Sequence, residues 1–424
     1  MKKLILLITV CVFFAQCATS DSGNGEEDPT DDGGQQQTND FVFSIFNNDI
    51  FGTGTTAIIY LTNESGQILA QENFVTDQET TLVSVGNKDL PHDLVFFFDF
   101  VGIDGKRRKN VFILEDIAEG SYQYGDTDIA ESNNDGLQVS LFNVDKRPFY
   151  ITSQDRVVLS PYSSSNGGTI DLSTVVGVSS NLNGTYLALR RNIDSFQRYY
   201  WDATPPISDP EEIDYTQLPL LDNIVSLSAP AGYDIGSIEI NGYTPNNQSD
   251  IGHRLFRFGF SGFNARDAYG VPDGIFNRYS IEVLYGIPNI THRLVKASNT
   301  PFTSIPVKTL SLDVNNTSLQ AFSATTSGDY DSFLSIYEYD DVSANTFYRV
   351  RIYGKKSAEI TFNHRFLMND LLGSGLNINN LAYQTIFLRN YDGVTGYNDF
   401  FEQYLRNAPY DIPRRLNFES VSTF

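Results

Sequence analysis

Cysteine is almost absent from this chain, and its two cysteines, Cys11 and Cys17, stand close to the N-terminus. The rest of the sequence therefore offers no disulfide, no thiolate nucleophile and no cysteine-ligated zinc site. Its stability must come from hydrophobic cores instead. The chain can build them, because 41% of its 424 residues are hydrophobic, and its length favours two or three folded units.

Positive charge is also scarce. Lysine and arginine number 29 against 52 aspartates and glutamates, which gives a formal net charge of −23. A surface this acidic repels nucleic acid, so we exclude nucleic acid as a partner. The one basic run, Lys106-Arg107-Arg108-Lys109, lies at a predicted hairpin tip, where charged residues commonly serve solubility.

Catalytic sequence motifs are missing as well. The chain has no HExxH, no phosphate-binding loop and no dinucleotide fingerprint. Its histidines are at least 39 residues apart, and we expect them to be structural or exposed. Carboxylates are too numerous for the sequence to single out the pair that glycoside hydrolysis requires. The histidines are His92, His253, His292 and His364. The sequence therefore favours a non-enzymatic protein but leaves the question of an enzyme open.

The N-terminus has the pattern of an export signal. Lys2 and Lys3 precede an apolar run from Leu4 to Ala15, which is too short to span a bilayer as a helix. The run leads into Phe14-Ala15-Gln16-Cys17, which resembles the lipobox of exported lipoproteins of the Bacteroidetes (flavobacterial) type. Gln16 departs from the usual small residue at its position.

This resemblance implies that residues 1–16 are a signal peptide and that Cys17 carries the lipid. Membrane association is then expected through this lipid, in the outer membrane. Ordinary signal cleavage near Ala18 is the alternative. Residues 17–40 are predicted to be a disordered tether, because residues 18–40 hold seven acids and no base. Acids directly after a lipidated cysteine resemble the signal that sends such lipoproteins to the cell surface, although a plain spacer has the same composition.

From Phe41 onward, short apolar alternations broken by Gly, Asn and Asp predict an all-β fold of tandem β-sandwich domains. The expected domains are 41–145 (a prealbumin- or Ig-like sandwich), 146–304 (a second β domain) and 305–424 (a third β domain with short C-terminal helices). Within the first, Ile117–Tyr124 (IAEGSYQY) resembles the closing strand of prealbumin-like and carboxypeptidase-regulatory sandwiches.

Individual elements follow from the same patterns. Among the predicted strands are Thr56–Thr62, Leu94–Ile103 and Phe347–Tyr353, and Asp104-Gly105 is a predicted hairpin turn. Four prolines in the segment Trp201–Pro219 predict a long loop. Helical spacing predicts helices over Phe366–Leu372 and Tyr397–Asn407.

Two clusters are candidate binding sites. Tyr199, Tyr200 and Trp201 offer aromatic faces that could stack on sugar rings, with packing over a core as the alternative. The acids Asp126, Asp128, Glu131 and Asp135 provide oxygen ligands suited to calcium, with a solvated loop as the alternative. No other cofactor is predicted.

Our leading expectation for function is a cell-envelope lipoprotein that acts as a non-enzymatic surface binding or scaffold protein, with a glycan or an envelope protein as its ligand. The alternative is a polysaccharide-processing hydrolase that uses a carboxylate pair. A minor alternative is an outer-membrane β-barrel, because the chain ends in Phe424. Ser420 and Ser422 occupy alternate positions that would be apolar in such a barrel.

Overall fold

The computed structural model is built mainly from β-strands, which make up 58% of it, while helices make up 7%. The predicted all-β fold is therefore confirmed. The residues described below are 39–424 apart from the following gaps: 50, 53, 126–133, 145–148, 153–156, 161–169, 180–183, 192–196, 205–210, 222, 229–230, 232–233, 246, 248–251, 259–267, 288–289, 307–308, 363–370, 372–375, 409–417 and 424.

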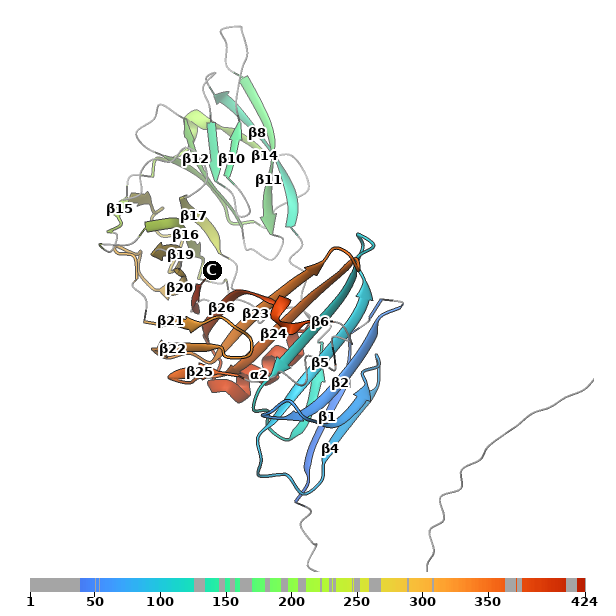
Figure 1. Ribbon diagram of the computed structural model, residues 1–424. Helices are drawn as coiled ribbons and strands as arrows, with labels where there is room; N and C mark the ends of the chain where they lie inside the picture. The colour runs from blue at the N-terminus through green and yellow to red at the C-terminus, as the bar shows by residue number, and fades with distance from the viewer. Residues whose placement is uncertain are drawn as a thin grey trace, which may run out of the picture. The chain divides into compact units, whose positions relative to one another are not determined.

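One sheet of twelve strands dominates the structure (Figure 1). Its neighbouring strands are antiparallel, except that β24 and β6 run parallel. In sheet order the strands are β17 (His253–Phe258), β16 (Asp234–Tyr243), β19 (Arg278–Ile287), β20 (Ile290–Ser298), β27 (Phe418–Thr423), β26 (Ala382–Tyr391), β23 (Ser332–Asp341), β24 (Thr346–Lys355), β6 (Arg107–Leu114), β5 (His92–Val101), β2 (Thr56–Asn63) and β3 (Ile68–Asn73).

Five smaller sheets accompany it. Their strands, in sheet order, are β4 (Glu79–Ser84), β1 (Phe41–Asn47) and β7 (Gly120–Tyr124); β21 (Ser311–Asn316), β22 (Ser323–Ser327) and β25 (Glu359–Thr361); β10 (Val157–Ser160), β9 (Phe149–Thr152), β12 (Thr185–Arg191) and β13 (Arg198–Asp202); β11 (Ile170–Ser179), β8 (Asn134–Val144) and β14 (Glu211–Asp214); and β15 (Ile224–Ser226) with β18 (Ala268–Gly270). The helical segments are η1 (Tyr215–Gln217), η2 (Ile378–Asn380) and α2 (Gly396–Asn407).

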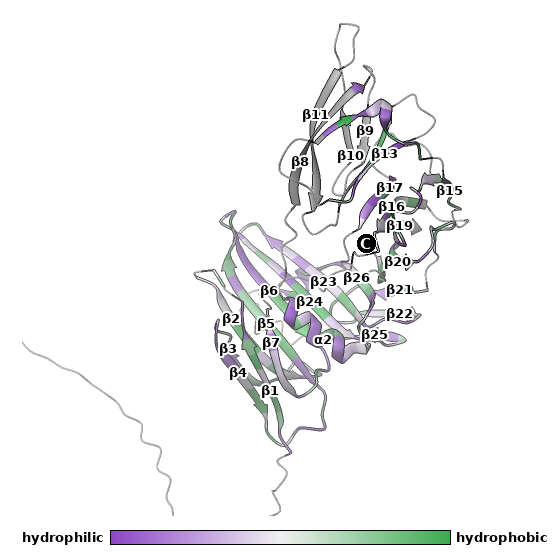
Figure 2. Ribbon diagram, turned by 180° about the vertical axis from the view of Figure 1, so that it is seen from behind, coloured by the Kyte–Doolittle hydropathy of each residue, from purple (hydrophilic) through white to green (hydrophobic). Residues whose placement is uncertain are grey.

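The strand β5 is apolar along most of its length because both of its faces are buried. Phe96 packs in a core with the inner residues of β1 and with α2, whereas Phe97 packs in a second core with residues of β21, β22 and β25. The sequence of a strand that is buried on both faces is a continuous apolar run, whereas a strand with one exposed face alternates apolar and polar residues. The hydrophobic colouring along β1, β2 and β5 reflects these cores (Figure 2).

A third core lies around β12, β16, β17 and β19. Ile238, Ile240, Ile281 and Val283 are buried in it, and all four are at most 1% exposed. Trp201 packs against its edge. Among the described residues, no helix has the length and apolar character that crossing a membrane requires.

Most predicted strands agree with the structure to within a few residues. Thr56–Thr62 corresponds to β2, Leu94–Ile103 to β5 and Phe347–Tyr353 to β24. The helix predicted over Tyr397–Asn407 is α2, and it buries Phe400, Phe401, Tyr404 and Leu405. The other predicted helix, Phe366–Leu372, lies outside the described residues except for Leu371, which is helical.

The loop predicted from Trp201 to Pro219 is wrong in part. Trp201 and Asp202 complete β13, Glu211–Asp214 forms β14, and β14 pairs in parallel with β8. The sequences of β13 and β14 contain no proline, so every residue of these strands keeps a backbone N–H for pairing. Burial of Ile213, which is 3% exposed, favours the strand there.

The predicted division into 41–145, 146–304 and 305–424 stays a prediction. Strands from all three segments take part in the twelve-stranded sheet. In particular, β6 from the first segment pairs with β24 from the third.

Candidate functional site

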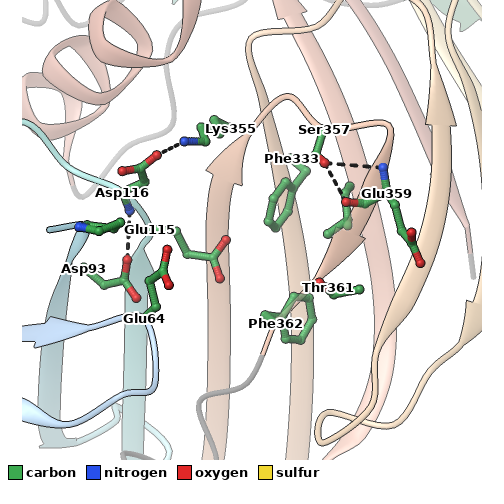
Figure 3. Close-up of a pocket in the computed structure, with 12 residues that line it drawn as sticks. Glu64, Asp93, Glu115, Asp116, Phe333, Lys355, Ser357, Glu359, Thr361 and Phe362 are labelled. Carbon is green, nitrogen blue, oxygen red and sulfur yellow. Dashed lines mark hydrogen bonds and ion pairs between the residues drawn. The ribbon is translucent and has the colours of Figure 1, made fainter.

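A hollow of about 550 Å³ opens where several strands of the large sheet end (Figure 3). Carboxylates and one lysine line one side of it, and phenylalanine rings line another. We call it the acidic hollow. Its lining residues are Glu64, Pro91, Asp93, Glu115, Asp116, Phe333, Lys355, Ser357, Glu359, Ile360, Thr361 and Phe362.

The strand pairing brings the carboxylates together. Leu94 of β5 lies opposite Leu114 of β6 in antiparallel register, so Asp93 and Glu115 are neighbours at the same sheet end. Because β6 and β24 run parallel, with Leu114 beside Tyr353, β24 ends at the same edge of the sheet. Its last residue, Lys355, therefore lies close to the carboxylates. Residues that are far apart in the sequence thus meet in one place.

The turn after β6 is held in a defined shape. Asp116 has a φ of 53°, in the left-handed region that non-glycine residues seldom adopt. Its backbone N–H donates to Oδ1 of Asp93 at 2.8 Å, and the N–H of Ile117 donates to the carbonyl of His92 at 2.8 Å. The Asp116 carboxylate forms an ion pair with Lys355 of β24. These contacts fix the side chain of Asp116 at the rim of the hollow.

Glu115 lines the hollow and acts electrostatically on Tyr397 of α2. Burial, together with the nearby charges of Glu115 and Asp93, raises the pKa of the Tyr397 phenol well above its ordinary value. The Tyr397 hydroxyl donates to the carbonyl of Tyr353 at 3.3 Å. Tyr397 is therefore a neutral hydrogen-bond donor at neutral pH, and it packs beneath the carboxylates.

Gly354 makes room for both sides of the hollow. A Cβ atom at this position would lie 2.3 Å from Cε1 of Phe333 and 2.5 Å from Oε2 of Glu115. Both distances are shorter than van der Waals contact. A glycine therefore allows the phenyl ring and the carboxylate to approach the same stretch of β24.

The aromatic side is firmly packed. Phe333 is 3% exposed and Phe362 is 7% exposed, and the Phe362 ring stacks on Phe322 with centroids 4.5 Å apart. Ser357 and Thr361 lie at the exposed rim beside these rings. The hollow thus combines apolar ring surface, hydroxyl groups and carboxylates.

This combination suits a polyhydroxylated or amine-bearing ligand. Carboxylates accept strong hydrogen bonds from hydroxyl and ammonium groups, and ring faces take apolar C–H surface. A metal site is a weaker interpretation, because the described residues contain no group of three or more His, Cys, Asp and Glu side chains arranged to hold a metal ion.

The aromatic cluster predicted from the sequence lies elsewhere, on β13. Trp201 and Tyr199 are half-buried and pack toward the third core. The Trp201 ring is edge-on to His253 at 5.3 Å and to Phe276 at 6.0 Å. None of Tyr199, Tyr200 and Trp201 lines the acidic hollow. Their role in stacking on a sugar stays a prediction.

Other predicted positions lie partly or wholly outside the described residues. Cys17, Asp126, Asp128 and Glu131 are not described. Asp135 belongs to the backbone of β8, where it pairs with Val178 of β11, and its side chain is not described. Lipidation and calcium binding therefore stay predictions.

The four residues of the basic run at the β5–β6 hairpin all contact other residues of the chain. Lys106 pairs with Asp340, and Lys109 lies over the Tyr348 ring at 5.7 Å. The other two form ion pairs, Arg107 with Asp99 at 2.6 Å and Arg108 with Asp104 at 2.9 Å.

The residues of the acidic hollow were not predicted as a site. One signal was present in the sequence: Asp93 stands at the start of a buried strand, and Glu115 and Asp116 directly follow the next one. A hairpin must place such residues side by side. The contribution of β24 and β25 comes from far along the chain and has no comparable signal.

Comparison with known proteins gives no family assignment. No protein-family model matches the sequence, and no curated protein matches it either. The functional interpretation therefore depends on the chain itself.

Proposed function

We propose that this protein is a lipoprotein of the bacterial outer membrane, anchored through Cys17 and exposed at the cell surface, which binds a glycan in the acidic hollow without modifying it. The leader and its lipobox-like end support the location. The tether at 17–40 gives the β-sheet part room to reach ligand outside the membrane.

The observation that carries the binding function is the composition of the acidic hollow. Phe333 and Phe362, although only 3% and 7% exposed, form an apolar wall, and Glu64, Glu115 and Glu359 provide acceptors for the hydroxyl groups of a sugar (Figure 3). Binding sites for small ligands typically combine apolar walls with a few placed polar groups in this way.

The binding test uses the full chain in detergent on a glycan array. Thr361→Arg places a long side chain at the exposed rim of the hollow, and we expect it to reduce binding about tenfold or more. The matched control is Thr56→Arg at the exposed start of β2, outside the lining residues, which should bind as the unmodified protein does. Equal binding by both variants would place the glycan elsewhere.

The location is tested separately in cells. We expect metabolic lipid labelling of the unmodified protein and none of Cys17→Ser, and we expect protease added to intact cells to remove the β-sheet part. An unlabelled or protected protein would contradict the surface location and leave the binding test unaffected.

A second candidate, a polysaccharide hydrolase, is favoured by one observation: several carboxylates share one side of the hollow. Glycosidases act with two such groups, one of which usually has a raised pKa. Burial raises the pKa of Asp331, but Asp331 does not line the hollow. Release of reducing sugar that is lost in Glu115→Gln, with binding retained, would establish the hydrolase instead.

A further inference from the structure

Two further hollows, of about 500 Å³ and about 330 Å³, share lining residues with the acidic hollow. Asp116 lines all three. Lys355 lines the first and second, and Pro91 lines the first and third. Because they share these residues, the three hollows are neighbours around the turn after β6, and together we call them the groove.

Asp116 is the point where the parts of the groove meet. Its left-handed backbone and the hydrogen bond from its N–H to Asp93 hold the side chain outward. The side chain is 34% exposed and is paired with Lys355, which is 61% exposed. A ligand that extends beyond one hollow must therefore pass this ion pair.

The groove is strongly negative. Seven carboxylates and two lysines line it, which leaves five formal negative charges in excess. Both lysines already face carboxylates: Lys88 Nζ lies 2.7 Å from Glu119, and Lys355 pairs with Asp116. A concave surface lined by one sign of charge attracts ligands of the opposite sign.

Exposed apolar surface in the groove comes from Pro91, which lines the first and third hollows, and from Leu90, which lines the third. The phenylalanines that line these two hollows are at most 7% exposed. Leu90 is 58% exposed, so its side chain is available to a ligand. An occupant of matching chemistry is long, has apolar faces at intervals and carries positive charge.

We propose that the groove holds an extended, amine-bearing oligosaccharide that passes over Asp116 and occupies the first and third hollows together. This inference rests on the proposed function and adds to it the ligand's length and charge. Ammonium groups on the sugar meet the carboxylates, and apolar ring faces meet Pro91 and Leu90.

The test is calorimetric titration of the full chain in detergent with glucosamine oligomers of two and six units, and with their N-acetylated counterparts. The six-unit amine should bind about tenfold more tightly than the two-unit amine. It should also bind about tenfold more tightly than the uncharged N-acetylated six-unit oligomer, and this difference should shrink when salt rises from about 50 mM to about 500 mM.

Leu90→Ala then tests the third hollow. It should weaken binding of the six-unit amine about fivefold and leave the two-unit amine unchanged. Val83→Ala on β4 is the matched control, because Val83 is 40% exposed and does not line the groove. Unfolding curves of both variants verify that they are folded.

Each contrary result overturns a different claim. Equal affinity for two and six units would refute the extended groove while leaving glycan binding in the first hollow. Equal affinity for amine and N-acetylated oligomers would refute the charge preference. Tight binding of oligolysine in place of the sugars would assign the groove to a basic peptide. Failure of every glycan on the array to bind would refute the proposed function itself.

Discussion

The carboxylate of Asp93 accepts a hydrogen bond of 2.8 Å from the backbone N–H of Asp116, which stands in a left-handed conformation. Asp93 is 3% exposed, so the bond is shielded from water. It joins the start of β5 to the turn that follows β6, and this turn lies at the junction of the groove.

Replacing Asp93 with alanine should therefore affect both stability and binding. Loss of the buried acceptor is expected to lower the free energy of unfolding by about 1–3 kcal/mol, because the Asp116 N–H loses its partner. Asp93→Asn keeps an acceptor oxygen and should retain more of the stability. Urea unfolding of the two variants checks this, and equal losses would show that the hydrogen bond is not the cause.

Gly354→Ala should destabilise the protein by about 1–3 kcal/mol, because its methyl group would overlap the Phe333 ring and the Glu115 carboxylate. The matched control is Gly52→Ala, where a Cβ meets nothing within 4 Å, and the change should stay within about 0.5 kcal/mol. Thermal unfolding measures both. A neutral Gly354→Ala would mean that the two walls of the hollow can move apart.

His253 should make stability depend on pH. Its imidazole is 2% exposed, its Nε2 has no hydrogen-bond partner among the described residues, and burial lowers its pKa to about 4. The unfolded chain, with an ordinary pKa of about 6.5, binds the proton more readily between these values. Stability therefore falls as the pH drops from about 6.5 to about 4.

The measurement compares the unmodified protein with His253→Phe at pH 7 and pH 5. The histidine should account for about 2 kcal/mol of the stability lost between these pH values, and the variant should lack that part of the loss. An identical pH dependence of the two proteins would contradict a buried neutral His253.

Glu419 should be a structural carboxylate. It is 7% exposed and accepts hydrogen bonds from the Thr309 N–H at 2.7 Å, the Thr309 hydroxyl at 2.6 Å and the Leu310 N–H at 2.9 Å. Glu419→Ala should cost about 3 kcal/mol in denaturant unfolding, because it leaves these donors without their acceptor. Glu402→Ala, at an exposed ion pair on α2, should cost about 0.5 kcal/mol or less. Similar costs for the two would refute this role.

Local patterns in the sequence were sufficient to predict several strands, among them β2, β5 and β24, and the helix α2. The run through Phe96 and Phe97 predicted a buried strand, and the spacing of Phe400 and Tyr404 predicted a helix, because both signals depend on neighbouring residues only. The pairing of β6 with β24 could not be predicted in this way. It joins segments more than 200 residues apart, and no local signal specifies such a partner.

The candidate site was missed for the same reason. Trp201, the only tryptophan in the sequence, was predicted to bind a ligand, yet its ring packs beside His253 against a core. Asp93, Glu115 and Lys355 are ordinary residues in an acidic sequence. Only the sheet register brings them into one hollow.

The scarcity of cysteine provides the most direct test of the central claim that a glycan occupies the acidic hollow. Since the sequence has cysteine only at positions 11 and 17, Thr361→Cys introduces a thiol at the rim, and Thr56→Cys introduces one away from it. At a concentration of six-unit glucosamine oligomer about ten times its Kd, alkylation of Thr361→Cys should slow about tenfold, while Thr56→Cys reacts as before. Unchanged alkylation of Thr361→Cys under bound ligand would contradict the account.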